Sequence, residues 1–214
     1  MILGMTRRFV AVLLLLSLSM TTLAACGDKG AWASDDVIQA ARHVHGGQPE
    51  LTLVTILSRD THRGEHTGLF INGRERVIFD PAGSWRLPDQ ALRGDVVFGM
   101  TKGAGLSYYM THVRETHYAV VQRVPVSEEV AEQALALALQ NGSVSAGFCA
   151  ASTSGVLRQL PGFETVRRTF FPQTLMRSFA EIPGVQTYEL HHNDPDVQLK
   201  AWRVQEPLST AAAF

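Results

Sequence analysis

The chain has 214 residues, in which 19 lysine and arginine residues face 20 aspartate and glutamate residues, so its formal charge is −1. This balance lacks the basic excess typical of nucleic-acid-binding proteins, and no nucleic-acid partner is expected. The length suits one ordinary domain behind a short leader. Such a domain can bury a sufficient core without disulfides, and only two cysteines are present.

The first 25 residues have the pattern of an export signal. Two arginines precede an apolar run at 9–20, and small residues follow it before Cys26. The run is too short for a comfortable membrane span and ends in a cleavage-type site. We therefore expect residues 1–25 to be removed. The formal charge then changes from −1 to −3, because two arginines and no acidic residue are lost.

The residues around Cys26 resemble the lipobox of bacterial lipoproteins. The leader ends in Leu-Ala-Ala-Cys-Gly, with Cys26 at the cysteine position. In that pattern the cysteine receives a fatty acid such as palmitate and becomes the new N-terminus, which implies a lipid anchor in a bacterial membrane. Residues 26–34 would form a tether, and the domain would face the periplasm or the exterior of the cell envelope. Ordinary cleavage after Ala25, without lipid, is the alternative.

The elements after the tether mix helices and strands without regular βαβ alternation, which predicts an α+β domain over residues 35–204. Ser34 and the residues after it predict a helix over 35–45 that stops at Gly46-Gly47. A run rich in β-branched residues predicts a strand at 51–57. Two strand-like runs at 65–71 and 76–81 flank Asn72-Gly73, and this step predicts a hairpin whose register stays open.

The later elements are predicted from the same signals of periodicity, capping and turn residues. Residues 205–214 carry no pattern and are expected to form a C-terminal tail. The predicted elements are a short strand at 95–98, a helix or irregular segment at 103–114, a strand at 117–124, helices at 128–140, 149–157 and 172–182, and two final strands at 185–190 and 197–204.

Cys149 lies among small residues at the start of the predicted helix 149–157. Unpaired N–H groups and the helix dipole favour an anion there, which lowers the pKa of a thiol. If Cys26 carries lipid, Cys149 has no disulfide partner in an oxidising compartment, and a nucleophile is the leading explanation. The alternative is an inert, buried cysteine.

A thiol nucleophile needs a base within hydrogen-bond reach and a group that orients the base. His66 is favoured because it lies on a predicted strand just before Thr67 and Gly68, where a small residue leaves room beside an imidazole. Asp80, at the end of the partner strand, can accept from the other imidazole nitrogen. The other candidate bases are His43, His45, His62, His112, His117, His191 and His192.

The segment from His66 to Gly73, with 77–81, resembles the His–Gly–aliphatic hairpin of the NlpC-type cell-wall hydrolases. In ordinary members of that family the cysteine precedes the histidine, whereas here His66 precedes Cys149 by some eighty residues. This order resembles the circularly permuted papain-like branch, which includes lecithin:retinol acyltransferase-like proteins and several bacterial lipoproteins. Residues 148–152 are similar to the nucleophile segment of that branch, and the resemblance spans roughly 50–165.

The resemblance implies a permuted papain-like fold, with a small antiparallel sheet or partial barrel packed with helices. It implies Cys149 as nucleophile, His66 as base and a third polar residue. Alignment on Pro81 puts Phe79 at the third position, and only a shifted register brings Asp80 there. The implied activity is thiol-dependent hydrolysis of an amide bond, as in a peptidoglycan peptide, without a cofactor. Lipid acyl transfer or thioesterase activity, and an inactive lipid-anchored binding module, are the alternatives.

The shape and polarity of the pocket near the thiol would distinguish amide hydrolysis from lipid acyl transfer. An open polar groove would suit a peptide, and a deep apolar one would suit acyl chains. Aromatic residues are candidates to line it, although such residues more often belong to a core. These candidates are Trp85, Phe98, Tyr108 and Tyr109.

Histidines at positions 62, 66, 191 and 192 invite comparison with a metal site. On a strand, residues four apart share a face but lie too far apart for easy joint ligation. The sequence has no cysteine pair and no His-Glu-x-x-His pattern. No metal is therefore expected.

Overall fold

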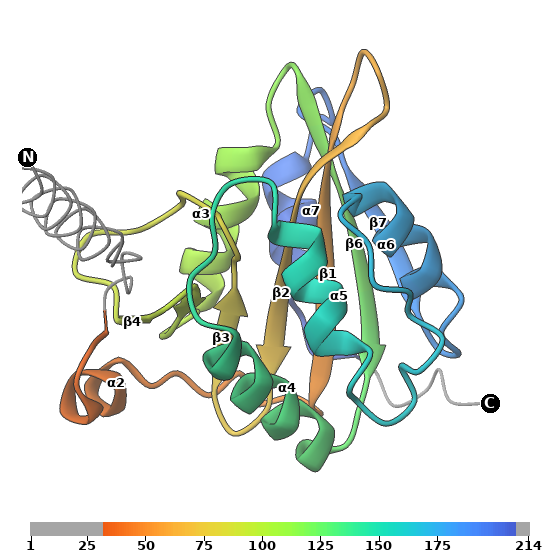
Figure 1. Cartoon of the computed structure of the whole chain (residues 1–214). Helices are drawn as coiled ribbons and strands as arrows, with labels where there is room; N and C mark the ends of the chain where they lie inside the picture. The colour runs from red at the N-terminus through yellow and green to blue at the C-terminus, as the bar shows by residue number, and fades with distance from the viewer. Residues whose placement is uncertain (1–31, 209–214) are drawn as a thin grey trace, which may run out of the picture.

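The structure is a computed structural model that describes residues 32–208. The predicted leader, Cys26 and most of the tether lie outside the described residues, as do residues 209–214. In the described range the chain forms six helices and one seven-stranded antiparallel sheet, which confirms the α+β class. The sheet is open and not closed into a barrel (Figure 1).

The strands follow the order β4-β5-β3-β2-β1-β6-β7, and each neighbouring pair is antiparallel. The predicted hairpin across Asn72-Gly73 is confirmed as β2 and β3, and the central strand β1 lies between β2 and β6. The strands are β1 (Glu50–Ser58), β2 (Gly64–Asn72), β3 (Arg76–Phe79), β4 (Leu92–Arg93), β5 (Val96–Val97), β6 (His117–Pro125) and β7 (Gln186–Leu190).

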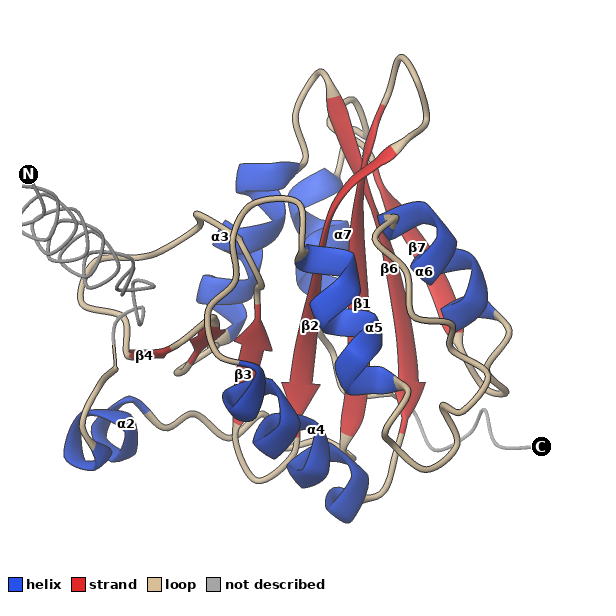
Figure 2. Cartoon of the chain, in the orientation of Figure 1, coloured by secondary structure: helices blue, strands red, loops and turns tan. Residues whose placement is uncertain are grey.

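Helices cover both faces of the sheet (Figure 2). One face carries α4 (Glu128–Asn141), α5 (Cys149–Leu157) and α6 (Pro172–Ala180). The other face carries α3 (Lys102–His112) and α7 (Val197–Arg203). The short α2 (Asp35–Ala41) lies beside the β4 edge, where Ala33 N–H donates to Leu92 O.

The two helical layers explain why β1 is buried along its whole length. Successive side chains of a strand point to opposite faces, so a strand between two layers needs apolar residues on both. Leu51 and Leu53 pack in the core beneath α4, α5 and α6. Val54 and Ile56 pack in the core beneath α3 and α7. Every residue of β1 is buried as a result.

The prediction of a final strand at 197–204 is wrong, because this segment is the helix α7. Apolar and polar residues alternate along it, which produced the strand signal. The same apolar residues also recur at helical spacing: Val197, Ala201 and Val204 all pack in the core with α3. The sequence of this segment fits both a strand and a helix, and packing against α3 selects the helix. The other late strand is confirmed as β7.

The first helix is shorter than predicted and ends at Ala41. The next residues leave the helix to bind the loop between β2 and β3. The Arg42 guanidinium donates to Arg74 O at 3.0 Å, and Arg76 N–H donates to His43 O at 2.8 Å. These long-range bonds replace the helical ones that residues 42–45 would otherwise make.

The packed domain continues past its predicted end at residue 204. The side chain of Gln205 is buried, its Oε1 accepts from Arg76 at 3.1 Å, and its Nε2 donates to Ala201 O at 2.9 Å. Its backbone carbonyl lies 2.6 Å from His45 Nε2. Gln205 thus fastens the C-terminal segment to the sheet, and Leu208 is buried beyond it.

Replacing Gln205 with alanine should destabilise the fold. Removal of its amide leaves the buried Arg76 guanidinium with one fewer acceptor, and an unsatisfied buried polar group costs about 1–3 kcal/mol. Urea unfolding should show a lower midpoint for Gln205→Ala. The exposed Gln39 on α2 is the matched control, and Gln39→Ala should leave the midpoint unchanged. Equal midpoints for the two variants would contradict the role given to Gln205.

Candidate active site

The thiol of Cys149 lies at the first residue of α5, against the central sheet. Gly147 adopts φ +87°, which a residue with a side chain rarely takes, and this turn brings the chain into the helix. The first helical bond runs from Ser152 N–H to Phe148 O at 2.9 Å. The N–H groups of Cys149 and Ala150 therefore precede the helical ladder, and that of Ala150 bonds to the Cys149 thiol.

His66 lies on β2 at a place where that strand has one free edge. β3 pairs with β2 only between Leu69 and Asn72, so the backbone around Thr67 has no partner strand on that side. The start of α5 occupies this edge, and the backbone N–H of Thr67 supports the Cys149 thiolate. The end of β3 thus opens the gap in which thiol and imidazole meet.

Asp80 follows β3 directly and is fully buried. Its Oδ1 lies 2.7 Å from His66 Nε2 and 3.2 Å from the Tyr108 hydroxyl, which donates to it. Its Oδ2 lies 3.5 Å from an Arg86 guanidinium nitrogen. Phe79, the alternative third residue, is instead buried in the core beneath α5. Of the two residues, Asp80 is the one that contacts His66.

Two glycines leave room for the Asp80 carboxylate. A Cβ at Gly83 would overlap Asp80 Oδ2, and a Cβ at Gly68 would lie 2.6 Å from the Tyr108 hydroxyl and 3.3 Å from Asp80 Oδ1. Neither glycine has a positive φ. The space taken by the carboxylate and its tyrosine partner therefore explains glycine at both positions.

The partners of His66 decide its charge. Burial alone lowers the pKa of His66, but hydrogen bonds to Asp80 and Cys149 and the charges of both groups outweigh it and raise that pKa from 6.5 to about 9. Burial likewise raises the pKa of Cys149. The bond to His66, its positive charge and the backbone N–H groups of Thr67 and Ala150 outweigh burial and lower the pKa of Cys149 overall. Both shifts favour the thiolate–imidazolium form of the pair over the neutral form.

His112 stacks on His66 with ring centroids 5.7 Å apart and an interplanar angle of 10°. Burial lowers the pKa of His112, a hydrogen bond to Tyr108 O opposes that effect, and the charge of His66 lowers it further. His112 is thus neutral while His66 carries charge, and its ring covers one face of the imidazolium. The remaining histidines contact neither His66 nor Cys149 in the described part of the chain.

Asp95 connects the two loops that deliver the catalytic groups. Its Oδ2 accepts from Ala82 N–H and from Val144 N–H, each at 3.0 Å. Ala82 belongs to the turn after Asp80, and Val144 belongs to the loop that leads into α5. One buried carboxylate oxygen therefore fixes both loops. No motif in the sequence singles out Asp95, Gly83 or Arg86, because their roles come from contacts distant in the chain.

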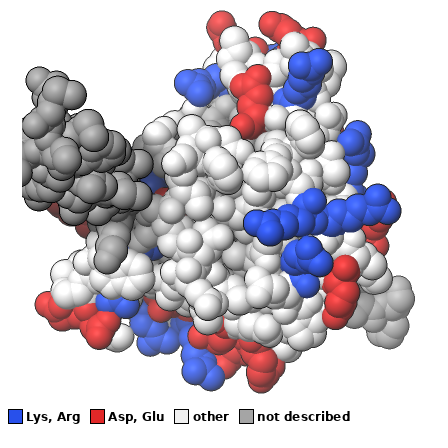
Figure 3. Space-filling model, viewed as in Figure 1, with Lys and Arg blue, Asp and Glu red and all other residues white. Residues whose placement is uncertain are grey.

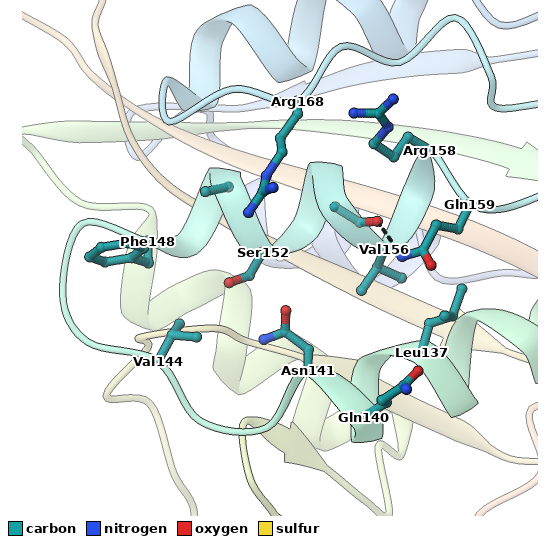
Figure 4. A pocket seen from close by; sticks show the side chains of 12 residues that line it. Leu137, Gln140, Asn141, Val144, Phe148, Ser152, Val156, Arg158, Gln159 and Arg168 are labelled. Atoms are coloured by element: carbon teal, nitrogen blue, oxygen red, sulfur yellow. Dashed lines mark hydrogen bonds between the residues drawn. The ribbon is translucent and has the colours of Figure 1, made fainter. Parts of the chain in front are cut away.

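A groove of about 610 Å³ runs along α5 (Figure 4). Phe148, the residue before Cys149, lines it, and Cys149 itself does not. Its floor is formed by small residues of α5, and its walls come from the end of α4 and from the loop before α6. It is lined by Leu137, Gln140, Asn141, Val144, Phe148, Ala151, Ser152, Gly155, Val156, Arg158, Gln159 and Arg168. None of the aromatic residues predicted to line a cleft is among them.

Those four aromatic residues belong to the interior. Tyr108, Tyr109, Trp85 and Phe98 are all buried. Tyr108 has a polar role that the sequence did not indicate, because its hydroxyl donates to Asp80. Burial raises the pKa of Tyr108 well above its ordinary value, with the charge of Asp80 adding to the effect, so the hydroxyl keeps its proton.

Comparisons with protein-family models, curated proteins and solved structures find no match to this chain. Between residues 32 and 208, no helix has the length and apolar character needed to cross a membrane. Within the same range, no group of three or more histidine, cysteine, aspartate or glutamate side chains is arranged to hold a metal ion.

Replacing Gly83 with alanine should displace the Asp80 carboxylate, because the added Cβ overlaps its Oδ2. His66 then loses its strongest partner, and its pKa should fall from about 9 toward 6.5. Histidine titration by NMR measures this shift. In the control Gly103→Ala, the added Cβ meets only Thr101 Oγ1 at 3.8 Å, and the pKa of His66 should not change. An unchanged pKa in both variants would contradict the packing described.

Proposed function

We propose that this chain is a thiol-dependent hydrolase that cleaves an amide bond, with Cys149 as nucleophile, His66 as general base and Asp80 as the residue that orients His66. The observation that supports it is the convergence of three side chains from β2, the end of β3 and the start of α5, with the His66–Asp80 bond at 2.7 Å. This is the arrangement of nucleophile, base and orienting group that covalent acyl transfer needs.

The reaction follows from the charge state of the pair. The Cys149 thiolate attacks the substrate carbonyl carbon and forms a C–S bond, while the backbone N–H groups of Cys149 and Ala150 stabilise the oxyanion. The His66 imidazolium donates its proton to the leaving amine as the C–N bond breaks. Water then attacks the thioester, His66 takes its proton, and the acid product leaves with the thiolate restored. Asp80 keeps the imidazole oriented throughout.

We also propose the permuted papain-like fold for this domain. The order of base before nucleophile supports it, as does a nucleophile helix packed on an open antiparallel sheet. The groove along α5, the helix that begins at Cys149, is open and contains amide and guanidinium side chains, which favours a polar substrate such as a peptidoglycan peptide.

Lipid acyl transfer on the same residues is the second candidate. Three aromatic side chains favour it: Phe148, Phe170 and Phe171 are 47%, 55% and 70% exposed, and Phe148 directly precedes the nucleophile. Phe148 and Phe170 also contact each other, with ring centroids 5.5 Å apart. Such an exposed apolar group can receive an acyl chain.

The pH dependence of alkylation tests the catalytic pair. An ordinary thiol has a pKa of about 8.5. In a chain carrying Cys26→Ser, iodoacetamide should modify Cys149 rapidly at pH values well below that pKa. His66→Ala removes the imidazolium that lowers the pKa of Cys149, so the alkylation profile should shift to higher pH. His62→Ala, on an exposed histidine outside the site, should leave the profile in place. A thiol that does not react in the folded chain, or a profile indifferent to His66, would refute the proposal.

We propose in addition that Cys26 carries lipid and anchors the domain outside the cytoplasm, facing the periplasm or the exterior. The lipobox-like sequence supports this. In bacteria fed an alkyne-labelled palmitate, the full chain should acquire the label and sediment with membranes, and Cys26→Ser should lose both properties. Cys149→Ser is the control and should keep the label. If the Cys26→Ser variant kept the label, the lipid would be attached to another residue and the proposal would be wrong.

A further inference from the structure

The charged side chains that line the groove along α5 are all positive. Two of its lining side chains are guanidinium groups, Arg158 and Arg168, and none is acidic. Neither arginine forms an ion pair within residues 32–208. Figure 3 shows blue side chains gathered on the right of a face that is mostly uncharged. The groove therefore carries positive charge that no acidic group within the described residues neutralises.

The wall that carries Arg168 is held in place before any ligand binds. Thr169 N–H donates to Ser154 Oγ at 3.1 Å, and Ser154 Oγ lies 3.4 Å from Thr169 O, so the residue after Arg168 is fastened to α5. Phe170, the next residue, packs edge-on against Phe148. Little conformational freedom of this segment is lost on binding, which favours affinity.

The floor of the groove leaves room for a ligand. A Cβ added at Gly155 would meet no atom within 4 Å, so this glycine opens directly into the groove. In Figure 4, Arg168 extends over α5 toward Ser152, and Asn141 approaches from the opposite wall. A volume of about 610 Å³ is in the range of small-molecule sites. Phe148 lines the groove and directly precedes Cys149, so an occupant of the groove would lie along the helix that begins at the proposed nucleophile.

We propose that this groove binds an acidic oxygen group of the substrate, a carboxylate or a phosphate, through Arg158 and Arg168. Guanidinium groups bind both with charge-assisted, often bidentate hydrogen bonds. The acidic group lies on the part of the substrate that extends from the scissile carbonyl along α5. The inference rests on the proposed function, because it names the substrate class of that same site.

Binding can be measured without catalysis. In the full chain with Cys149→Ala, the arginine Nε–Hε NMR signals are followed during titration with glutarate, glycerol 3-phosphate or the neutral glutaramide. Signals of Arg158 and Arg168 should shift saturably with the two acids and not with glutaramide. The acid that binds with the lower dissociation constant shows whether the groove prefers a carboxylate or a phosphate. Arg167 does not line the groove and serves as the internal control. Equal, unsaturable shifts in all three arginines would overturn the proposal.

Labelling then tests the link to the thiol. In a chain carrying Cys26→Ser, maleimides with alkyl chains of increasing length that end in a carboxylate are compared with their primary amides. At one length the acid should modify Cys149 about tenfold faster than the amide, as expected for one added charge-assisted contact. The double variant Arg158→Gln/Arg168→Gln should abolish this preference while the amide rate stays unchanged. Arg167→Gln should keep the preference.

The two proposals fail in different ways. Rapid labelling by the amides without a preference for the acids at any length overturns the substrate-class assignment and leaves the catalytic pair standing. A thiol inert toward both probes overturns the proposed function, and the NMR titration then decides whether the groove binds acids at all.

Discussion

The hydrogen bond between His66 Nε2 and Asp80 Oδ1 is the interaction on which the candidate site depends. A buried imidazole beside a thiol would ordinarily be neutral, and so would the thiol. The carboxylate reverses this balance by stabilising the imidazolium, which in turn stabilises the thiolate. The raised pKa of His66 contributes stability that is fully present below pH 6.5 and is lost as the pH rises through about 9.

The cost of placing this charge in the interior is reduced by close packing, by hydrogen bonds to Asp80 Oδ1 and by the charge of Arg86 near Asp80 Oδ2. Asp80 is fully buried and accepts from two side chains at its Oδ1, while Arg86 approaches its Oδ2. Glycines stand where any side chain would push the carboxylate away. The stacked ring of His112 adds a cover that carries no competing charge. The polar groups of the site are therefore enclosed by the sheet and by the helices α5 and α3, which cover its opposite faces.

Local signals predicted most of the fold, and contacts distant in the sequence account for the rest. The hairpin at Asn72-Gly73 and the helix from Glu128 to Asn141 are confirmed, because turn chemistry and caps determine both locally. The helix at 197–203 was mistaken for a strand, since its alternation fits either structure until α3 packs against it. Residues 42–45 were predicted to be helical but are not, because they form hydrogen bonds with the distant loop between β2 and β3.

The sequence drew attention to Cys149, His66 and Asp80, and the structure brings the last two into hydrogen-bond contact. It did not indicate Tyr108, Gly83 or Asp95 as parts of this arrangement, because nothing local distinguishes a buried tyrosine or aspartate that binds a distant loop. Nothing in the sequence indicated that Arg158 and Arg168 lie close together. Only the fold shows that both line one cavity, along α5.

Because Cys149 and His66 lie some eighty residues apart, thiol reactivity is a property of the folded state alone. In an unfolded chain the helix start, the imidazolium and the Thr67 N–H are all absent from the neighbourhood of Cys149. The thiol then has an ordinary pKa and is mostly protonated at neutral pH, so it reacts slowly with oxidants and with other thiols. In the nascent chain Cys149 is therefore an ordinary thiol, and the contacts that lower its pKa exist only after the domain has folded around it.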